Sequence, residues 1–137
     1  MKRRKFVKQC GVAGLACAVG PSVLSSCNSA FYVPHVVDGS KIIVNKIEFP
    51  AESNYVLVKN KRLPAPLYLR RNDEDSFTAL LMECTHKACE VQPFGDQLHC
   101  PCHGSEFSST GKVLEGPAEV DLRKFKVTTD AEKIYIS

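Results

Sequence analysis

The 137-residue sequence has no internal repeat and no low-complexity tract, which is typical of a single globular domain. It also lacks any convincing helical period of apolar residues beyond residue 30. Short apolar stretches alternate there with turn residues, so the sequence predicts an all-β, small antiparallel fold. Such a domain can bury a modest core, which a bound metal or a disulfide would help to stabilise.

The sequence also lacks the basic surface that a nucleic-acid partner would require. Its formal charge is +3, but residues 1–27 contain five basic residues and no acidic one. The remaining 110 residues hold 13 basic and 15 acidic residues, a formal charge of −2. We therefore expect no nucleic-acid partner.

A long apolar run is missing as well. The segment "QCGVAGLACAVGPSVL" is weakly apolar, is interrupted by Gly-Pro, and is short for a membrane-spanning helix, which needs about 20 apolar residues. The preceding "MKRRKFVK" is basic, so residues 1–27 read as an export signal. "RRKFVK" resembles the twin-arginine export motif, although an ordinary secretion signal with two arginines would look similar.

The signal ends in "LSSC", which resembles a bacterial lipobox and implies lipid attachment at Cys27. The alternative is a chance cysteine in an uncleaved anchor. Acyl chains would hold a small domain on a bilayer surface. We accordingly predict an exported bacterial lipoprotein, membrane-anchored and facing the periplasm or the cell exterior.

Residues 28–39 are expected to form a linker, and residues 40–137 the folded domain. Runs rich in β-branched and aromatic residues predict six strands. "RNDEDS" is expected to form a hairpin turn, and an aspartate turn should join the last two strands. The predicted strands are Lys41–Phe49, Tyr55–Lys59, Leu67–Arg70, Phe77–Glu83, Val120–Thr128 and Lys133–Ile136.

Four of the seven cysteines and three of the four histidines lie between residues 84 and 103. Cys84 and His86 are two apart, and Cys100 and His103 are three apart, so each pair can reach one metal from its own loop. Two cysteines and two histidines suit tetrahedral zinc. One metal plus a disulfide, or a binuclear cluster plus a disulfide, fits these spacings equally well.

The segments "CTHKAC" and "CPCHGS" resemble the two cluster-binding boxes of Rieske iron–sulfur proteins, and the second matches without a gap. The resemblance is strong over residues 80–126. It implies stacked antiparallel sheets with a two-loop cluster-binding subdomain. It also implies one [2Fe-2S] cluster per chain, with Cys84 and Cys100 on one iron and His86 and His103 on the other.

The same resemblance implies roles for residues around the cluster. Cys89 and Cys102 would form a disulfide that joins the two loops. Ser105 matches a serine whose hydroxyl hydrogen-bonds a cluster sulfide. Gly116 and Pro117, in "GPA", resemble the proline loop that covers the cluster.

The implied disulfide selects a subgroup. Rieske-type ferredoxins usually lack it, whereas quinol-oxidising cytochrome complexes and the small subunit of arsenite oxidase have it. An oxygenase catalytic subunit needs a second domain with a two-histidine, one-carboxylate iron site. The chain is too short for that domain, and only His35 and His99 remain as histidines. We expect His99 to face away from the metal, and His35 to have no role.

The departures from the quinol-oxidising pattern guide the functional hypothesis. Lys87 and Ala88 stand where those proteins usually carry leucine and glycine, and an ammonium group is costly to bury against a quinone pocket. We predict a one-electron carrier that relays electrons to a haem or oxidoreductase partner. One alternative is the iron–sulfur subunit of a quinol–cytochrome c reductase complex, and a second is a non-redox zinc-binding lipoprotein. We identify no catalytic residue or substrate site.

Phe107 is the other departure. Quinol-oxidising Rieske proteins commonly have a tyrosine at this position, whose hydroxyl donates to a cysteine ligand sulfur. Phenylalanine keeps the ring but has no donor. The sequence therefore predicts a reduction potential some tens of millivolts below that of a relative with both hydroxyl donors.

Overall fold

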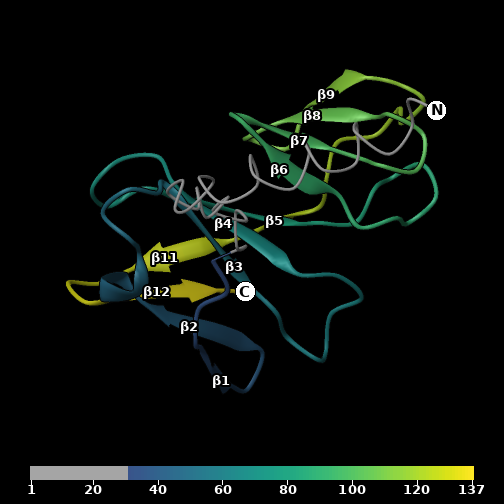
Figure 1. The fold of residues 1–137 in the computed structure, drawn as a ribbon. Coiled ribbons are helices and arrows are strands. Elements are labelled where there is room, and N and C mark those ends of the chain that lie inside the picture. The colour runs from purple at the N-terminus through teal and green to yellow at the C-terminus, as the bar shows by residue number, and fades with distance from the viewer. Residues whose placement is uncertain (1–30) are drawn as a thin grey trace, which may run out of the picture.

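The computed structural model describes residues 31–137, so the export signal and Cys27 lie outside the described residues. Twelve strands form three four-stranded antiparallel sheets in this part of the chain (Figure 1). The first sheet has the order β1-β2-β12-β11. Its strands are β1 (Val36–Asp38), β2 (Lys41–Asn45), β11 (Val127–Thr129) and β12 (Lys133–Ile136).

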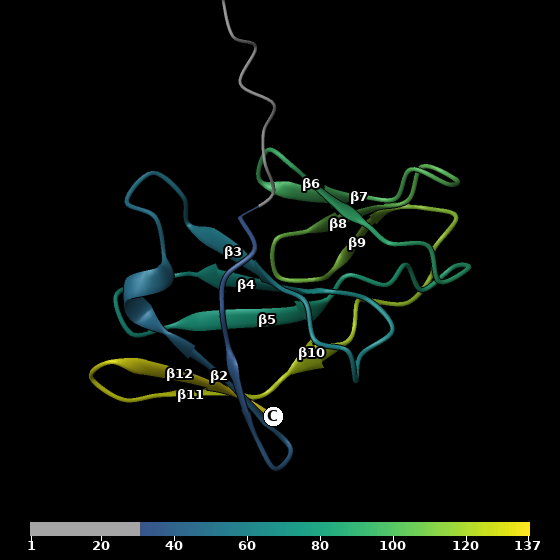
Figure 2. The same ribbon diagram turned by 60° about the horizontal axis from the view of Figure 1, so that its bottom comes forward.

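The second sheet lies between the other two and has the order β10-β5-β4-β3 (Figure 2). Its strands are β3 (Tyr55–Val58), β4 (Leu67–Arg71), β5 (Phe77–Leu81) and β10 (Lys124–Phe125). The third sheet, β6-β7-β8-β9, forms a separate lobe. Its strands are β6 (Gln92–Phe94), β7 (Gln97–His99), β8 (Glu106–Ser108) and β9 (Val113–Glu115).

The middle sheet is buried on both faces. Because successive side chains of a strand point to opposite faces, Leu67 and Leu69 of β4 pack into a first core against β2 and β12. Tyr68, between them, packs into a second core beneath the third sheet. This double burial explains why three consecutive residues of β4 and four of β5 are buried, and it supports the lobe that carries the site.

The predicted all-β class is confirmed, and only one short 3₁₀ helix, η1 (Lys46–Glu48), interrupts the strands of the described residues. The hairpin turn at residues 72–76 and the aspartate turn are also present. Asp130 Oδ1 accepts hydrogen bonds from the backbone N–H groups of Glu132 (2.9 Å) and Lys133 (2.7 Å). No helix in residues 31–137 is long and apolar enough to cross a bilayer.

Several boundaries differ from the prediction. The strand expected over residues 41–49 ends at Asn45, where pairing with Lys133 ends and η1 begins. The strand expected over residues 120–128 is instead the short β10 and β11, and residues 120–123 form no strand. Part of the expected linker pairs with the domain, because β1 joins β2 and Tyr32 bridges to Leu57. The four short strands β6 to β9 were not predicted.

Candidate metal centre

Two loops with the same backbone pattern hold the candidate ligands. In the first loop, which follows β5, the Cys84 N–H donates to the Cys89 carbonyl, and the Ala88 N–H donates to the Cys84 carbonyl, both at 2.8 Å. In the second loop, between β7 and β8, the Cys100 N–H donates to the Ser105 carbonyl at 2.8 Å. The Gly104 N–H there donates to the Cys100 carbonyl at 3.0 Å. In each loop, the backbone N–H and carbonyl groups of the first cysteine therefore hold the loop closed.

The fifth residue of each loop has a left-handed backbone conformation. Gly104 has φ of 83°, and Ala88, at the equivalent position, has φ of 59°. Glycine adopts this conformation without a steric penalty, whereas alanine brings its Cβ too close to the backbone. Ala88 is the only described non-glycine residue with a positive φ. The first loop is therefore strained at the position where the resemblance leads one to expect glycine.

The sulfur and nitrogen ligand candidates lie on different sides of the site. The Cys84 and Cys100 side chains are unpaired thiols, 2% and 1% exposed, in the second core. His86 is half-buried and His103 is exposed, and their rings meet edge to face with centroids 4.9 Å apart. The structure thus brings the four predicted residues to two adjacent loops, with the thiols inward and the imidazoles outward.

The chemistry of this donor set fits an iron–sulfur cluster with mixed ligation. Two buried thiols without a disulfide partner are suited to bind metal as thiolates. His86 Nδ1 is the one buried side-chain nitrogen or oxygen of the described residues that has no hydrogen-bond partner. Buried polar atoms are rarely left unpaired in proteins, so this nitrogen has the environment of a metal ligand.

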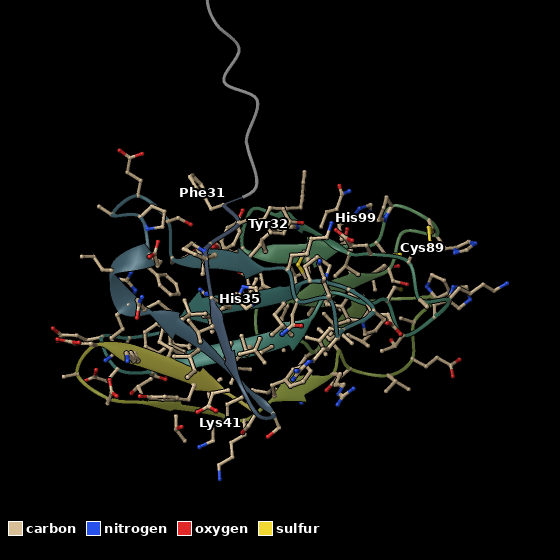
Figure 3. All side chains as sticks on the ribbon, turned by 90° about the horizontal axis from the view of Figure 1, so that it is seen from below. Phe31, Tyr32, His35, Lys41, Cys89 and His99 are labelled. Atoms are coloured by element: carbon tan, nitrogen blue, oxygen red, sulfur yellow. A yellow bond between two sulfur atoms is a disulfide. The ribbon has the colours of Figure 1, made fainter. Side chains whose placement is uncertain are left out.

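A disulfide joins the two loops, as predicted. Cys89 and Cys102 are bonded with an S–S distance of 2.07 Å and Cα atoms 6.5 Å apart. Figure 3 shows Cys89 at one end of the domain, with the sulfur–sulfur bond beside it. The Sγ atoms of Cys89, Cys100 and Cys102 lie within 4.8 Å of one another. Because two of these sulfurs are bonded together, the trio offers a single thiol and is not a separate metal site.

The segment that includes Gly116 and Pro117 contacts both loops. Ser105 is fully buried, and its Oγ accepts a hydrogen bond from the Ala118 N–H at 3.0 Å. The hydroxyl hydrogen of Ser105 is thereby left for another acceptor. On the first loop, Thr85 Oγ1 donates to the Val120 carbonyl at 2.5 Å. The sequence predicts a role for "GPA" but not the hydrogen bonds of Ala118 and Thr85, because these join residues 13 and 35 apart that no local sequence pattern links.

Phe107 lies in the wall beneath the thiols. It is fully buried in the second core, which also contains Cys84 and Cys100, and it pairs with Leu98 on β7 and Val113 on β9. The ring therefore packs in the core that supports the sulfur side of the site. It contributes no hydrogen-bond donor there.

The other two histidines are not part of the two loops. His99 is the last residue of β7, and its ring is 6.5 Å from the ring of Phe94, whereas His35 directly precedes β1 in the sequence. Figure 3 labels both residues. Lys87 is exposed in the first loop, next to His86. Its ammonium group adds a positive charge to the exposed part of the first loop.

Tyr68 packs in the same second core, and its phenol is perturbed. Its ring stacks on Tyr55 with centroids 5.0 Å apart, and it is 2% exposed. Burial, which disfavours the phenolate, raises the pKa of Tyr68 to about 12.

Comparisons with known proteins agree with this geometry. The Rieske [2Fe-2S] domain family matches residues 42–126. The cytochrome b6-f complex iron-sulfur subunit of Chlorobaculum tepidum is 37% identical over 68 residues, which are 48% of this chain and 38% of that protein. The subunit of the same name from Prochlorococcus marinus is 37% identical over 76 residues, covering 53% of this chain and 43% of that protein.

Among solved structures, the chain is similar to the cyanobacterial plasma membrane Rieske protein PetC3 from Synechocystis PCC 6803. The identity is 29% and the TM-score 0.53, over 61% of this chain and 86% of that chain. The matches span less than half the length of the two curated relatives.

Proposed function

Because this chain belongs to the Rieske [2Fe-2S] domain family, we propose that it is an exported, lipid-anchored carrier that relays electrons to a haem or oxidoreductase partner. Its cofactor is a Rieske [2Fe-2S] cluster, which accepts and releases one electron at a time. The observation that supports the proposal best is the pair of disulfide-linked loops with two buried thiols inside and two imidazoles outside.

In this proposal, Cys84 and Cys100 bind one iron, and His86 and His103 bind the other. The partnerless Nδ1 of His86 is the ligand atom that the burial pattern favours on that side chain. Two neutral imidazoles in place of two thiolates make the centre less negative. Such centres have potentials of about −150 to +300 mV, against about −400 mV for plant-type ferredoxins.

The exposed imidazole side is the side through which we expect electrons to pass. His103 is open to solvent, whereas both thiols are covered by the second core. A partner that docks over this surface comes close to the cluster without displacing any strand. We assign no catalytic residue to the chain, which acts through its partners.

A role as a subunit of a quinol-oxidising complex is the second candidate. Its support is the similarity to cytochrome b6-f complex iron-sulfur subunits. Against it stands Lys87, whose charge would have to leave water when the loop entered an apolar quinone pocket. The carrier role is therefore the one we favour. Because the chain belongs to the Rieske [2Fe-2S] domain family, the zinc-binding alternative is no longer supported.

Quinol oxidation by membranes separates the two candidates. Membranes from cells with and without the protein are compared in a quinol–cytochrome c assay, and a Cys84→Ala variant serves as the control for a cluster-free chain. The carrier role predicts equal quinol oxidation in all three preparations. Loss of this activity without the protein, and with Cys84→Ala, would favour the complex subunit.

The lipid anchor is tested separately from the redox role. A Cys27→Ser variant should lose incorporation of radiolabelled fatty acid and should leave the membrane fraction, because serine has no thiol to carry the lipid. Unchanged labelling in Cys27→Ser would contradict lipid attachment at this cysteine. The visible spectrum of the same preparations reports whether the cluster is still bound.

A further inference from the structure

Three aromatic side chains are exposed on the described domain. Phe31, Tyr32 and Phe94 are 41%, 47% and 74% exposed. Every other phenylalanine or tyrosine of residues 31–137 is buried or half-buried. We call the surface formed by Phe31, Tyr32 and Phe94 the aromatic face.

Two separate elements contribute to this one surface. Tyr32, near the start of the described chain, lines a groove of about 320 Å³ together with Gln92 and Pro93 of β6. Gln92 and Phe94 are two residues apart on β6, so they point to the same side of the strand. Figure 3 labels Phe31, Tyr32 and His99 on one side of the domain and Lys41 on the opposite side. The ring of Phe94 lies 6.5 Å from that of His99.

Backbone hydrogen bonds to β3 hold the first described residues of the chain at this surface. The carbonyl of Phe31 accepts a hydrogen bond from the Leu57 N–H at 2.8 Å, and the Val33 N–H donates to the Leu57 carbonyl at 3.0 Å. Cys27 precedes Phe31 by four residues. Because a fully extended chain spans at most about 3.6 Å per residue, a lipid on Cys27 would be tethered to Phe31 by a segment no longer than about 14 Å.

We propose that the aromatic face of the anchored protein rests in the interfacial layer of the lipid bilayer. The proposal rests on the proposed lipid attachment at Cys27, which would place acyl chains beside this surface. Aromatic side chains are favoured at the boundary between acyl chains and headgroups. The domain then has a fixed orientation on the membrane instead of freely rotating on a tether.

The charges around the face select the kind of lipid. Glu90 lines the same groove as Tyr32, and Asp96 is exposed two residues after Phe94. These carboxylates would be repelled by anionic headgroups. The contact is therefore apolar and suits zwitterionic phosphatidylcholine-type headgroups. Figure 3 shows Cys89, which belongs to the first cluster loop, at one end of the domain and away from Phe31 and Tyr32.

The absence of tryptophan from the sequence makes a direct test possible. The full-length lipidated protein, carrying Phe94→Trp, is reconstituted into phosphatidylcholine vesicles with or without brominated acyl chains, which quench nearby indoles. Its fluorescence should be lower on the brominated lipid. A Lys41→Trp variant, on the opposite side, should give equal fluorescence on both lipids. Flotation of the vesicles measures anchoring in the same samples.

Each outcome has one meaning. If both variants float with the vesicles and Phe94→Trp is not quenched, the aromatic face does not contact lipid and the proposal is wrong, although the anchor stands. If both variants are quenched equally, the domain has no fixed orientation, which also overturns it. If neither floats, the anchor itself fails, and the membrane contact fails with it. The visible spectrum of the cluster verifies that each variant is folded.

Discussion

Ser105 has a hydroxyl group that can donate a hydrogen bond, and Phe107 has none. This difference bears on the reduction potential of the cluster. The Ser105 hydroxyl oxygen accepts a hydrogen bond from the Ala118 N–H, and its own hydrogen can still be donated to a cluster sulfide. Phe107 brings a ring to the same core without a donor. Hydrogen bonds donated to a cluster stabilise its more negative reduced state and so raise the potential.

The Phe107→Tyr variant is therefore expected to have a higher potential than the natural protein. If the added hydroxyl reaches a ligand sulfur, the redox states differ in hydrogen-bond energy by about 1 kcal/mol, which is some tens of millivolts. Ser105→Ala should shift the potential in the opposite direction. Protein film voltammetry measures both shifts, and Phe107→Leu is the matched control without a hydroxyl. A potential for Phe107→Tyr equal to or below that of the natural protein would contradict this account.

Ala88 and Gly104 occupy the same position in two loops, and this pairing gives a second prediction. Ala88→Gly should relieve the left-handed strain and stabilise the first loop by about 0.5–1 kcal/mol, after the entropy cost of glycine. Gly104→Ala should destabilise the second loop by about 1–2 kcal/mol. The measurement is the temperature at which the visible absorption of the cluster disappears. Shifts of the same sign in the two variants would count against the equivalence of the loops.

The disulfide joins the two loops that carry the site, one after β5 and the other after β7. The two half-cystines are 13 residues apart, and closing a loop of that size stabilises a fold by about 3 kcal/mol. It binds no iron in our proposal. Its loss should weaken the site without eliminating the cluster.

The double variant Cys89→Ala with Cys102→Ala tests this role. It is preferable to a single change, which would leave a free thiol within 4.8 Å of Cys100. Iron content should remain near that of the natural protein, while cluster loss in denaturant should occur at a lower concentration. Cys100→Ala is the matched comparison and should contain no cluster. A folded double variant without iron would show that the disulfide is essential for assembly.

The elements that sequence patterns predicted best are those of the two-sided core. The strands around Val56, Leu69 and Ala79 are rich in apolar residues, and the structure confirms them because apolar side chains pack on both of their faces. β6 to β9 were not predicted, since each has three residues and few buried side chains. Their pairing depends on the adjoining loops, which no local pattern encodes.

The sequence predicted the residues of the site more completely than the strands around it. Cysteine and histidine spacings left zinc and iron–sulfur chemistry open, and the resemblance decided between them. The disulfide is confirmed, whereas the iron ligands remain a proposal. The contact of Ser105 with Ala118 joins residues 13 apart through backbone geometry, so it could not be read from side-chain identity.

At the scale of the whole molecule, the buried phenol of Tyr68 predicts a loss of stability in alkali. Its pKa is about 12 in the folded protein, against an ordinary value of 10. The unfolded chain therefore loses this proton first as the pH rises. The stabilisation is fully present below pH 10 and is lost between about pH 10 and 12, by roughly 2–3 kcal/mol in total.

Denaturant unfolding at several pH values checks this prediction. Tyr68→Phe keeps the ring but removes the titrating hydroxyl, so its stability should fall less steeply above pH 10. Tyr135→Phe is a comparison at the surface and not a neutral control, because the hydrogen bond that Tyr135 donates to Asp130 raises the pKa of that phenol as well. Identical alkaline profiles for the natural protein and Tyr68→Phe would show that Tyr68 does not control the transition.

The central claim for the molecule is that one [2Fe-2S] cluster is bound by two thiolates on one iron and two imidazoles on the other. Mössbauer spectroscopy of the purified, iron-57-labelled full chain tests it most directly, because each iron gives its own signal. We predict two inequivalent iron sites in equal amounts, with the electron of the reduced form localised on the imidazole-bound iron. Two equivalent irons, or a colourless protein that contains zinc, would contradict the claim.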